Sequence, residues 1–308
     1  MAKGKIVVFG SYVSEFISYQ EGLPIPGQTL LGTSFKTGLG GKGSNQAVAA
    51  NRCGADVTMI TKVGNDVLAD AVRDFYKKEG MDTSCFFVDP VNSTGSALIM
   101  VDEKTGQNQI VVIIGACQHI TEDEVEKVRP LIESASILLA QCETNLDALF
   151  YVIKIAHKAG VTVVLNPAPA APIPKDIMSI IDIITPNETE AQALTGIEVK
   201  DKESAAKAAE VFFNSGVKNV VITMGKQGAY ANDGKRGELF PCLPVDVIDA
   251  TGAGDAFNGG FVSALAEGKS LFDAVRFGNV TGSLSTTKAG SSVAMPYRRE
   301  VDAALQGA

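Results

Sequence analysis

The chain has 308 residues, of which 45% are hydrophobic and 20% are charged. This length allows one large α/β domain or two ordinary ones, and the composition excludes a wholly disordered chain. The formal net charge of −8 at pH 7 disfavours nucleic acid and anionic membranes as partners. A polyanionic ligand would therefore have to be bound by local dipoles and a metal ion rather than by the overall charge.

The sequence predicts a cytoplasmic protein. The opening stretch MAKGKIVVFGS has too short an apolar part for a signal peptide. The sequence contains no run of about 18 apolar residues, so no membrane span is expected. The cysteines are dispersed without CxxC spacing, which is typical of reduced thiols in the cytosol. They are Cys53, Cys85, Cys117, Cys142 and Cys242.

The first part of the chain predicts an alternation of strands and helices. Residues 5–10 form a short apolar run that ends at a glycine, as a buried first strand does. The elements expected next are a helix at 45–54, a strand at 57–63 and a helix at 65–79.

An insertion follows this alternation. Three expected strands, at 83–88, 94–102 and 107–114, have few helices between them, which indicates an antiparallel patch. We therefore expect a small β lid built from about residues 11–37 and 94–115.

Beyond residue 120, strands and helices alternate more regularly. Between two apolar strands, Leu146, Leu149, Phe150 and Ile153 have the i, i+3, i+4, i+7 spacing of an amphipathic helix. The expected strands are 136–141, 162–166, 182–185 and 220–223, and further helices are expected from 188 and at 201–214, 253–267 and 270–287. Such alternation predicts a single α/β domain over 1–308, with a mainly parallel central sheet between two layers of helices.

One glycine-rich segment, Gly38 to Gly43, fits the pattern G-x-G-x-x-G and has an acid, Asp56, within about 20 residues. A dinucleotide-binding loop should directly follow the first strand, however, and the first strand is expected at 5–10. The polar residues Lys42, Asn45 and Gln46 suit a hydroxylated ligand at least as well, and a tight turn that needs glycines is the structural alternative.

A second segment, residues 249–260 (DATGAGDAFNGG), predicts a loop that leads into a helix. Peptide N–H groups at a helix N-terminus form an anion site, which suits a phosphate that is being transferred. Asp255 would repel that anion unless its carboxylate accepts a proton from the attacking hydroxyl. A helix-capping aspartate is the structural alternative.

Other enzyme signatures are missing from the sequence. It has no Walker A loop, no HRD or DFG set, no GxSxG and no cluster of metal ligands. Phosphoryl transfer to a hydroxylated ligand, a nucleotide-dependent oxidoreductase that uses the 38–43 loop, and a non-catalytic sensor of such a ligand remain as interpretations.

Five segments together resemble the ribokinase-like family of carbohydrate kinases, in order and over essentially the whole chain. They are GLGGKGSNQAVAA from Gly38, NPAPA at 166–170, TPNETEA at 185–191, TMGKQGA at 223–229 and DATGAGDAFNGG at 249–260. The resemblance implies an ATP-dependent kinase that phosphorylates the terminal hydroxymethyl of a pentose, D-ribose in the first place. The alternatives are 2-deoxyribose and another furanose sugar or a nucleoside.

The resemblance also implies a role for particular residues. Asp255 would be the catalytic base, beside an anion hole formed by the N–H groups of Gly252, Ala253 and Gly254. The implied sugar ligands are Val13, Glu15, Gly41, Lys42, Asn45 and Glu143. The implied nucleotide site comprises Asn187, Thr223, Gly225 and Gly228, with Asn279 at the adenine.

Two cations and a partner are implied as well. Glu190, together with Asn187, would support Mg²⁺ through water. A potassium site would be built from Asp249 and the carbonyls of Thr251, Ser285, Lys288 and Gly290, although Ala294 stands where the family usually has a serine oxygen. The β lid would cover the sugar and mediate a homodimer.

The largest departure from the family lies at the sugar. Its members usually read GSxNxD after the first strand, whereas residues 10–15 here read GSYVSE. Val13 cannot hydrogen-bond a hydroxyl, and Glu15 is one methylene longer than aspartate. Because an unpaired buried hydroxyl costs about 1–3 kcal/mol, ribose is expected to bind less well than in the family pattern, and 2-deoxyribose is the main alternative.

Overall fold

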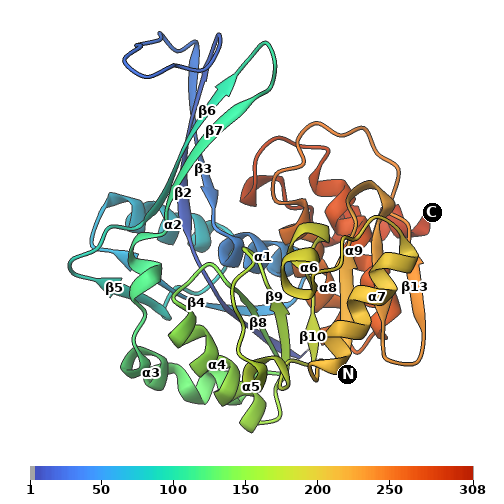
Figure 1. Cartoon of the computed structure of the whole chain (residues 1–308). Helices are drawn as coiled ribbons and strands as arrows, with labels where there is room; N and C mark the ends of the chain where they lie inside the picture. Colours follow the sequence, from blue (N-terminus) through green and yellow to red (C-terminus); the bar gives the residue numbers. More distant parts are fainter. Residues whose placement is uncertain (1–3, 308) are drawn as a thin grey trace.

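The computed structural model describes residues 4–307. Residues 1–3, part of the opening stretch considered above for a signal peptide, and residue 308 lie outside this range. The described strands form two sheets, one with nine strands and one with four (Figure 1). Within residues 4–307, no helix is both long and apolar enough to cross a bilayer.

The large sheet is mainly parallel. Its strands are, in spatial order, β13 (Gly237–Phe240), β12 (Ala229–Asn232), β11 (Asn219–Thr223), β10 (Ile183–Ile184), β9 (Thr162–Asn166), β8 (Ile137–Gln141), β1 (Lys5–Phe9), β4 (Asp56–Gly64) and β5 (Phe86–Asp89). From β11 to β5 neighbouring strands pair in parallel, and β12 and β13 add an antiparallel edge.

Helices cover both faces of this sheet because its central strands are apolar on both sides. In β1, Ile6 and Val8 join one buried apolar cluster, whereas Val7 and Phe9 join the other. The helices that contribute to the first cluster are α1 (Lys42–Arg52), α2 (Val67–Lys78), α8 (Ala253–Ala266), α9 (Leu271–Ser285) and α10 (Arg298–Gln306). Those of the second are α3 (Glu122–Glu133), α4 (Leu146–Lys158), α5 (Lys175–Met178), α6 (Glu188–Thr195) and α7 (Lys202–Asn214). The predicted three-layer α/β architecture is confirmed.

The small sheet projects from the body of the molecule (Figure 1). Its strands are, in spatial order, β3 (Ser34–Gly40), β2 (Val13–Gln20), β6 (Gly95–Asp102) and β7 (Asn108–Ile113). The expected antiparallel patch is correct for β2–β3 and β6–β7, but β2 and β6 pair in parallel.

The prediction that residues 83–88 belong to this patch is wrong. Phe86–Asp89 forms β5, which pairs in parallel with β4 at the edge of the large sheet. Phe86 is buried there, and its ring meets that of Tyr76 in α2 edge-on at 5.1 Å. Burial under the crossover helix α2 therefore places this strand in the large sheet.

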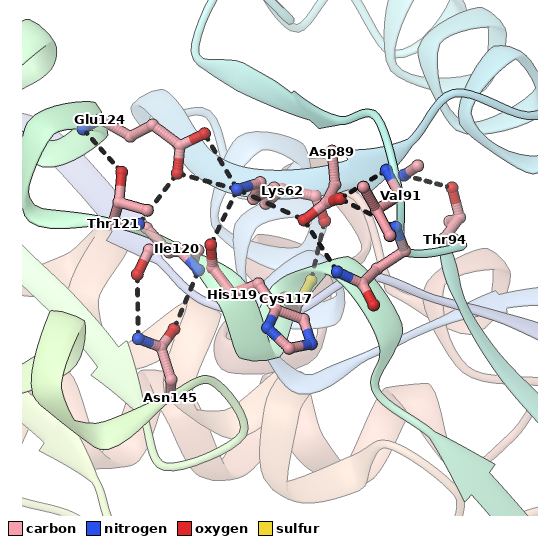
Figure 2. A network of polar contacts seen from close by, with 12 residues as sticks. Lys62, Asp89, Val91, Thr94, Cys117, His119, Ile120, Thr121, Glu124 and Asn145 are labelled. Atoms are coloured by element: carbon pink, nitrogen blue, oxygen red, sulfur yellow. Dashed lines mark hydrogen bonds and ion pairs between the residues drawn. The ribbon is translucent and has the colours of Figure 1, made fainter.

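Lys62 anchors the base of the β6–β7 hairpin (Figure 2). Its ammonium lies 3.4 Å from Asp89, before the hairpin, and donates to the carbonyl oxygen of His119, after it, at 2.7 Å. It also pairs with Glu124 of α3 at 3.0 Å. One buried cation thus ties together the two segments through which the hairpin joins the large sheet.

Candidate active site

Asp255 lies in the first turn of α8, as its sequence segment predicts. The helix is capped by Gly252, whose φ of 75° is a left-handed conformation that favours glycine. The N–H group of Ala253 donates to Ala250 at 3.2 Å, so it is already engaged within the loop. Around the position of a side chain on Gly254, no heavy atom of the described residues lies within 4 Å apart from its chain neighbours and the nearby backbone of α8, so the loop has an open face there.

Two consecutive amides of α1 hold the carboxylate of Asp255. Asn45 donates from Nδ2 to Oδ2, and Gln46 donates from Nε2 to Oδ1, each at 2.9 Å. Burial raises the pKa of Asp255, while Lys42 and these two hydrogen bonds oppose the rise. A fixed carboxylate with a raised pKa is suited to accept a proton from an alcohol.

Lys42 and Glu143 meet at the start of α1. The peptide N–H of Lys42 donates to Oε2 of Glu143 at 2.8 Å, and the hydroxyl of Ser11 donates to the same oxygen. Burial lowers the pKa of Lys42, but the charges of Asp255, Glu143 and Glu190 more than offset it, so that this pKa is raised. Lys42 therefore stays protonated among three carboxylates.

Val13 and Glu15 lie on β2, where the small sheet meets the body. Val13 is buried and pairs with Gly40 of β3. The carboxylate oxygens of Glu15 lie 3.0 and 3.1 Å from the hydroxyl of Ser291, and burial raises its pKa. With Gly41 as the N-cap of α1, the predicted sugar ligands gather between the small sheet and the starts of α1 and α8.

The predicted nucleotide segments lie side by side at the ends of two neighbouring strands. Asn187 forms a parallel bridge with Thr223, which closes β11. Gly225 and Gly228 follow in a short turn, where a side chain on Gly228 would come within 2.0 Å of the carbonyl oxygen of Phe240. Asn279 uses its amide nitrogen inside the protein, donating to Phe240 at 2.9 Å.

Glu190 and Asn187 form a reciprocal capping box at the start of α6. Glu190 accepts from the N–H of Asn187 at 2.9 Å, and Asn187 accepts from the N–H of Glu190 at 2.8 Å. Burial raises the pKa of Glu190. The pair therefore has a structural role in addition to the one implied at the phosphates.

Asp249 connects the segments of the predicted potassium site. Its carboxylate accepts from the N–H groups of Thr251 and Gly290, each at 2.9 Å. The side chains of Ser285 and Lys288, whose carbonyls were predicted as ligands, are engaged elsewhere: the hydroxyl of Ser285 donates to Gly282 at 2.8 Å, and Lys288 pairs with Glu300 at 2.7 Å. Residues 4–307 contain no group of three or more His, Cys, Asp or Glu that could hold a metal ion.

The dinucleotide-binding interpretation of the 38–43 loop lacks its structural context. Gly38 and Gly40 lie in β3 of the small sheet, and α1 begins at Lys42. A dinucleotide fingerprint belongs in the first βα turn of a parallel sheet.

Ser11, Ser291 and Ser292 were not assigned a role from the sequence, and Gln46 was expected only as a polar group that suits a hydroxylated ligand. Ser11 holds Glu143, Gln46 holds Asp255, Ser291 holds Glu15, and Ser292 donates to Oδ1 of Asn45 at 2.6 Å. Ser11 lies close in sequence to Val13, a predicted ligand, so its motif could have suggested it. Nothing in the local pattern distinguishes the two serines.

Comparison with known proteins identifies relatives along the whole chain. The model of the pfkB family carbohydrate kinases matches residues 3–298. A ribokinase from Haemophilus influenzae is 42% identical to this chain over 295 residues, which cover 96% of each protein. A deoxyribokinase from Salmonella typhi is 32% identical over 292 residues, which cover 94% of this chain and 95% of the relative. The solved structure of an Arabidopsis thaliana ribokinase complexed with ribose and ATP is 30% identical and superposes with a TM-score of 0.91 over 99% of both chains.

These matches agree with the geometry of the site. A buried carboxylate at a glycine-rich helix start stands beside a lysine and a second carboxylate, as expected for a kinase that phosphorylates a sugar hydroxyl. The chain belongs to the pfkB family of carbohydrate kinases.

Proposed function

We propose that this protein is an ATP-dependent ribose kinase, which converts D-ribose and ATP into ribose 5-phosphate and ADP. The observation that carries the proposal is the carboxylate of Asp255, fixed by Asn45 and Gln46 at the opening turn of α8. Relatives named ribokinase, 42% identical in the case of the Haemophilus influenzae protein, support ribose as the sugar.

Asp255 acts as the general base in this proposal. It takes the proton of the terminal hydroxymethyl while that oxygen bonds to the γ-phosphorus and the bond from phosphorus to the departing ADP oxygen breaks. The N–H groups of Gly252, Ala253 and Gly254 stabilise the negative charge that develops on the phosphoryl oxygens, which requires the N–H of Ala253 to leave the carbonyl oxygen of Ala250 when substrate binds. Because the first N–H groups of a helix have no intrahelical acceptor, this end of α8 is suited to that role.

Lys42, Glu143, Gly41 and Asn45 bind the sugar in this proposal, with Glu15 and Val13 at its other side. The side of the site formed by Asn187, Thr223, Gly225, Gly228 and Asn279 binds ATP. The bridge between Asn187 and Thr223 supports this assignment, since it aligns two of the segments at one sheet edge.

Both proposed cations fit the oxygen-rich donor sets present. Mg²⁺, supported by Glu190 and Asn187, would neutralise phosphate oxygens when bound. For K⁺, the support is that the N–H group of Gly290 holds Asp249, which brings the 249–251 and 285–290 segments together. Ala294 offers no side-chain oxygen to this site.

We further propose a cytoplasmic homodimer that pairs through the small sheet. Support comes from apolar side chains that are exposed on its strands, namely Phe35, Leu98, Ile110, Val111 and Val112. Large exposed apolar faces on a sheet are typical of association surfaces. The small sheet would also act as the lid over the sugar.

A second candidate substrate is 2-deoxyribose, because buried Val13 offers no hydrogen bond to a sugar hydroxyl. ADP release, measured across D-ribose, 2-deoxyribose, fructose, tagatose and nucleosides, tests both candidates. The proposal predicts the highest kcat/KM with D-ribose and a product phosphorylated at the terminal hydroxymethyl. Turnover of 2-deoxyribose alone would favour the second candidate, and sugar binding without ADP release would favour a sensor.

A further inference from the structure

The segment Gly290–Ser292, between α9 and α10, crosses the site and places two adjacent hydroxyls in it. Ser291 is 2% exposed and Ser292 is fully buried. Arg52 of α1 holds the backbone just beyond them, donating to the carbonyl oxygens of Val293 at 3.0 Å and Met295 at 2.7 Å. The course of this segment is therefore anchored by contacts other than the two hydroxyls.

Ser291 gives the carboxylate of Glu15 one defined position. Its hydroxyl lies 3.0 and 3.1 Å from the two carboxylate oxygens and 2.8 Å from the carbonyl oxygen of Leu39 in β3. On the other side the carboxylate packs against Gly38 and Gly40, where an added Cβ would come within 2.4 and 2.2 Å of its oxygens. The carboxylate is thus enclosed between β3 and a single hydroxyl.

Ser292 determines which end of the Asn45 amide faces Asp255. The hydroxyl of Ser292 donates to Oδ1 of Asn45 at 2.6 Å, and Nδ2 of the same amide donates to Oδ2 of Asp255 at 2.9 Å. An ionised carboxylate can only accept hydrogen bonds. Were the amide turned over, its oxygen would face the carboxylate, and the donor would be lost.

We propose that Ser291 and Ser292 are positioning residues with separate tasks: Ser291 holds Glu15 for sugar binding, and Ser292 holds Asn45 so that Asp255 is aligned for proton transfer. The inference rests on the proposed sugar kinase activity and extends it to a segment that lies outside the glycine-rich motifs in sequence but contacts the first of them in the fold. Neither serine needs to touch the substrate, because each acts through the side chain that it fixes.

The two serines serve as matched controls for each other. Both are buried, adjacent and of the same size, so Ser291→Ala and Ser292→Ala remove equivalent atoms. Initial rates are measured for each variant over a range of D-ribose concentrations, at saturating ATP and one fixed potassium concentration. Thermal unfolding of each variant is recorded alongside.

Ser291→Ala should raise the KM for D-ribose about tenfold, since a hydrogen bond to a charged group is lost, and should leave kcat within about twofold of the wild type. Ser292→Ala should lower kcat about tenfold, and because Asn45 is also a proposed sugar ligand, any rise in its KM should be smaller than that in Ser291→Ala. Equal changes in both variants, or wild-type kinetics in both, would overturn the inference.

A double-mutant cycle tests the route through Asn45. In an Asn45→Ala background, Ser292→Ala should cause no further loss of kcat, because the side chain that it orients has gone. An undiminished effect of Ser292→Ala in that background would contradict the inference. Ser292→Cys provides a second variant, because a thiol is similar in size to a hydroxyl but is a weaker hydrogen-bond donor. It should lower kcat less than Ser292→Ala does. A full wild-type kcat in Ser292→Cys would also count against the role assigned to this hydroxyl.

The outcome is separable from that of the proposed function. If the wild-type enzyme phosphorylates D-ribose and neither variant shows its expected split, the positioning roles are wrong and the kinase activity stands. If the wild-type enzyme releases no ADP with any sugar, the proposed function itself fails.

Discussion

Gln46 in α1 and Asp255 in α8 are joined by a hydrogen bond of 2.9 Å between Nε2 and Oδ1. The same nitrogen donates to Asn166 at the end of β9 at 2.9 Å, and the amide oxygen of Gln46 accepts from Gln141 at the end of β8 at 2.7 Å. The carboxylate is therefore positioned by amides that are themselves fixed to the central strands of the large sheet. Its placement is a property of the whole fold rather than of the glycine-rich loop alone.

Replacing Gln46 by leucine should move the pH dependence of the reaction. The pKa of Asp255 is raised by burial and lowered by Lys42, Gln46 and Asn45, so loss of the Gln46 donor should raise it further. A base acts in its ionised form, and the acidic limb of kcat/KM should therefore shift to higher pH. The control is Gln192→Leu, which makes the same change at an exposed position of α6. Identical acidic limbs in the pH profiles of the two variants would refute the assignment of Asp255 as the base.

Val13→Asn should change the choice between sugars. An amide at this buried position can pair with a hydroxyl that valine leaves without a partner. The ratio of kcat/KM for D-ribose to that for 2-deoxyribose should rise by about tenfold. Competition between the two sugars in one reaction measures this ratio directly. A ratio that stays constant would show that Val13 does not face the distinguishing hydroxyl.

Lys62→Met should destabilise the fold. The change leaves Asp89 and Glu124 without their shared cation in the network of Figure 2, where the side chains of Lys62 and Asp89 are each 6% exposed. Removing one partner of a buried ion pair costs about 3–5 kcal/mol of unfolding free energy, which urea denaturation can measure.

The matched control for this change is Lys104→Met. Lys104 pairs with Glu21 on the surface, and both side chains are 66% exposed. Surface pairs contribute little, so the urea midpoint of this variant should match that of the wild type. Equal shifts in the two lysine variants would show that the Lys62 network does not stabilise the junction of the hairpin.

Gly228→Ala should disrupt the turn that we assign to the nucleotide. Gly228 has φ 98°, and an added Cβ would lie 2.0 Å from the carbonyl oxygen of Phe240. At Gly234, with φ 82°, a Cβ would meet no described atom within 4 Å beyond its two chain neighbours, so alanine there should cost only the left-handed backbone strain of about 1–2 kcal/mol. A KM for ATP raised in Gly228→Ala and unchanged in Gly234→Ala is expected. The reverse pattern would place the nucleotide elsewhere.

Local patterns in the sequence predicted those features that depend on neighbouring residues. The start of α8 with Asp255 in its first turn follows from a run of glycines before an apolar helix, and β1 follows from its apolar run. The layered architecture follows from the alternation of such elements.

Features that depend on distant residues could not be predicted in this way. Phe86–Asp89 has the composition of a strand, but its partner β4 is chosen by burial under α2, which no local pattern specifies. Glu15 and Ser291 are 276 positions apart, and Asn45 and Ser292 are 247 apart. Only the folded chain brings these pairs together, so no local pattern singles out either serine.

Asp255→Asn is the most direct test of the central claim, that a buried carboxylate at the start of α8 removes the proton of the sugar hydroxyl. The control is Asp147→Asn, which removes an exposed carboxylate from the first turn of α4. With D-ribose and ATP, Asp255→Asn should lower kcat by about 10²-fold or more while ATP still binds, and Asp147→Asn should leave kcat unchanged. An Asp255→Asn enzyme that keeps most of the wild-type kcat would contradict the account.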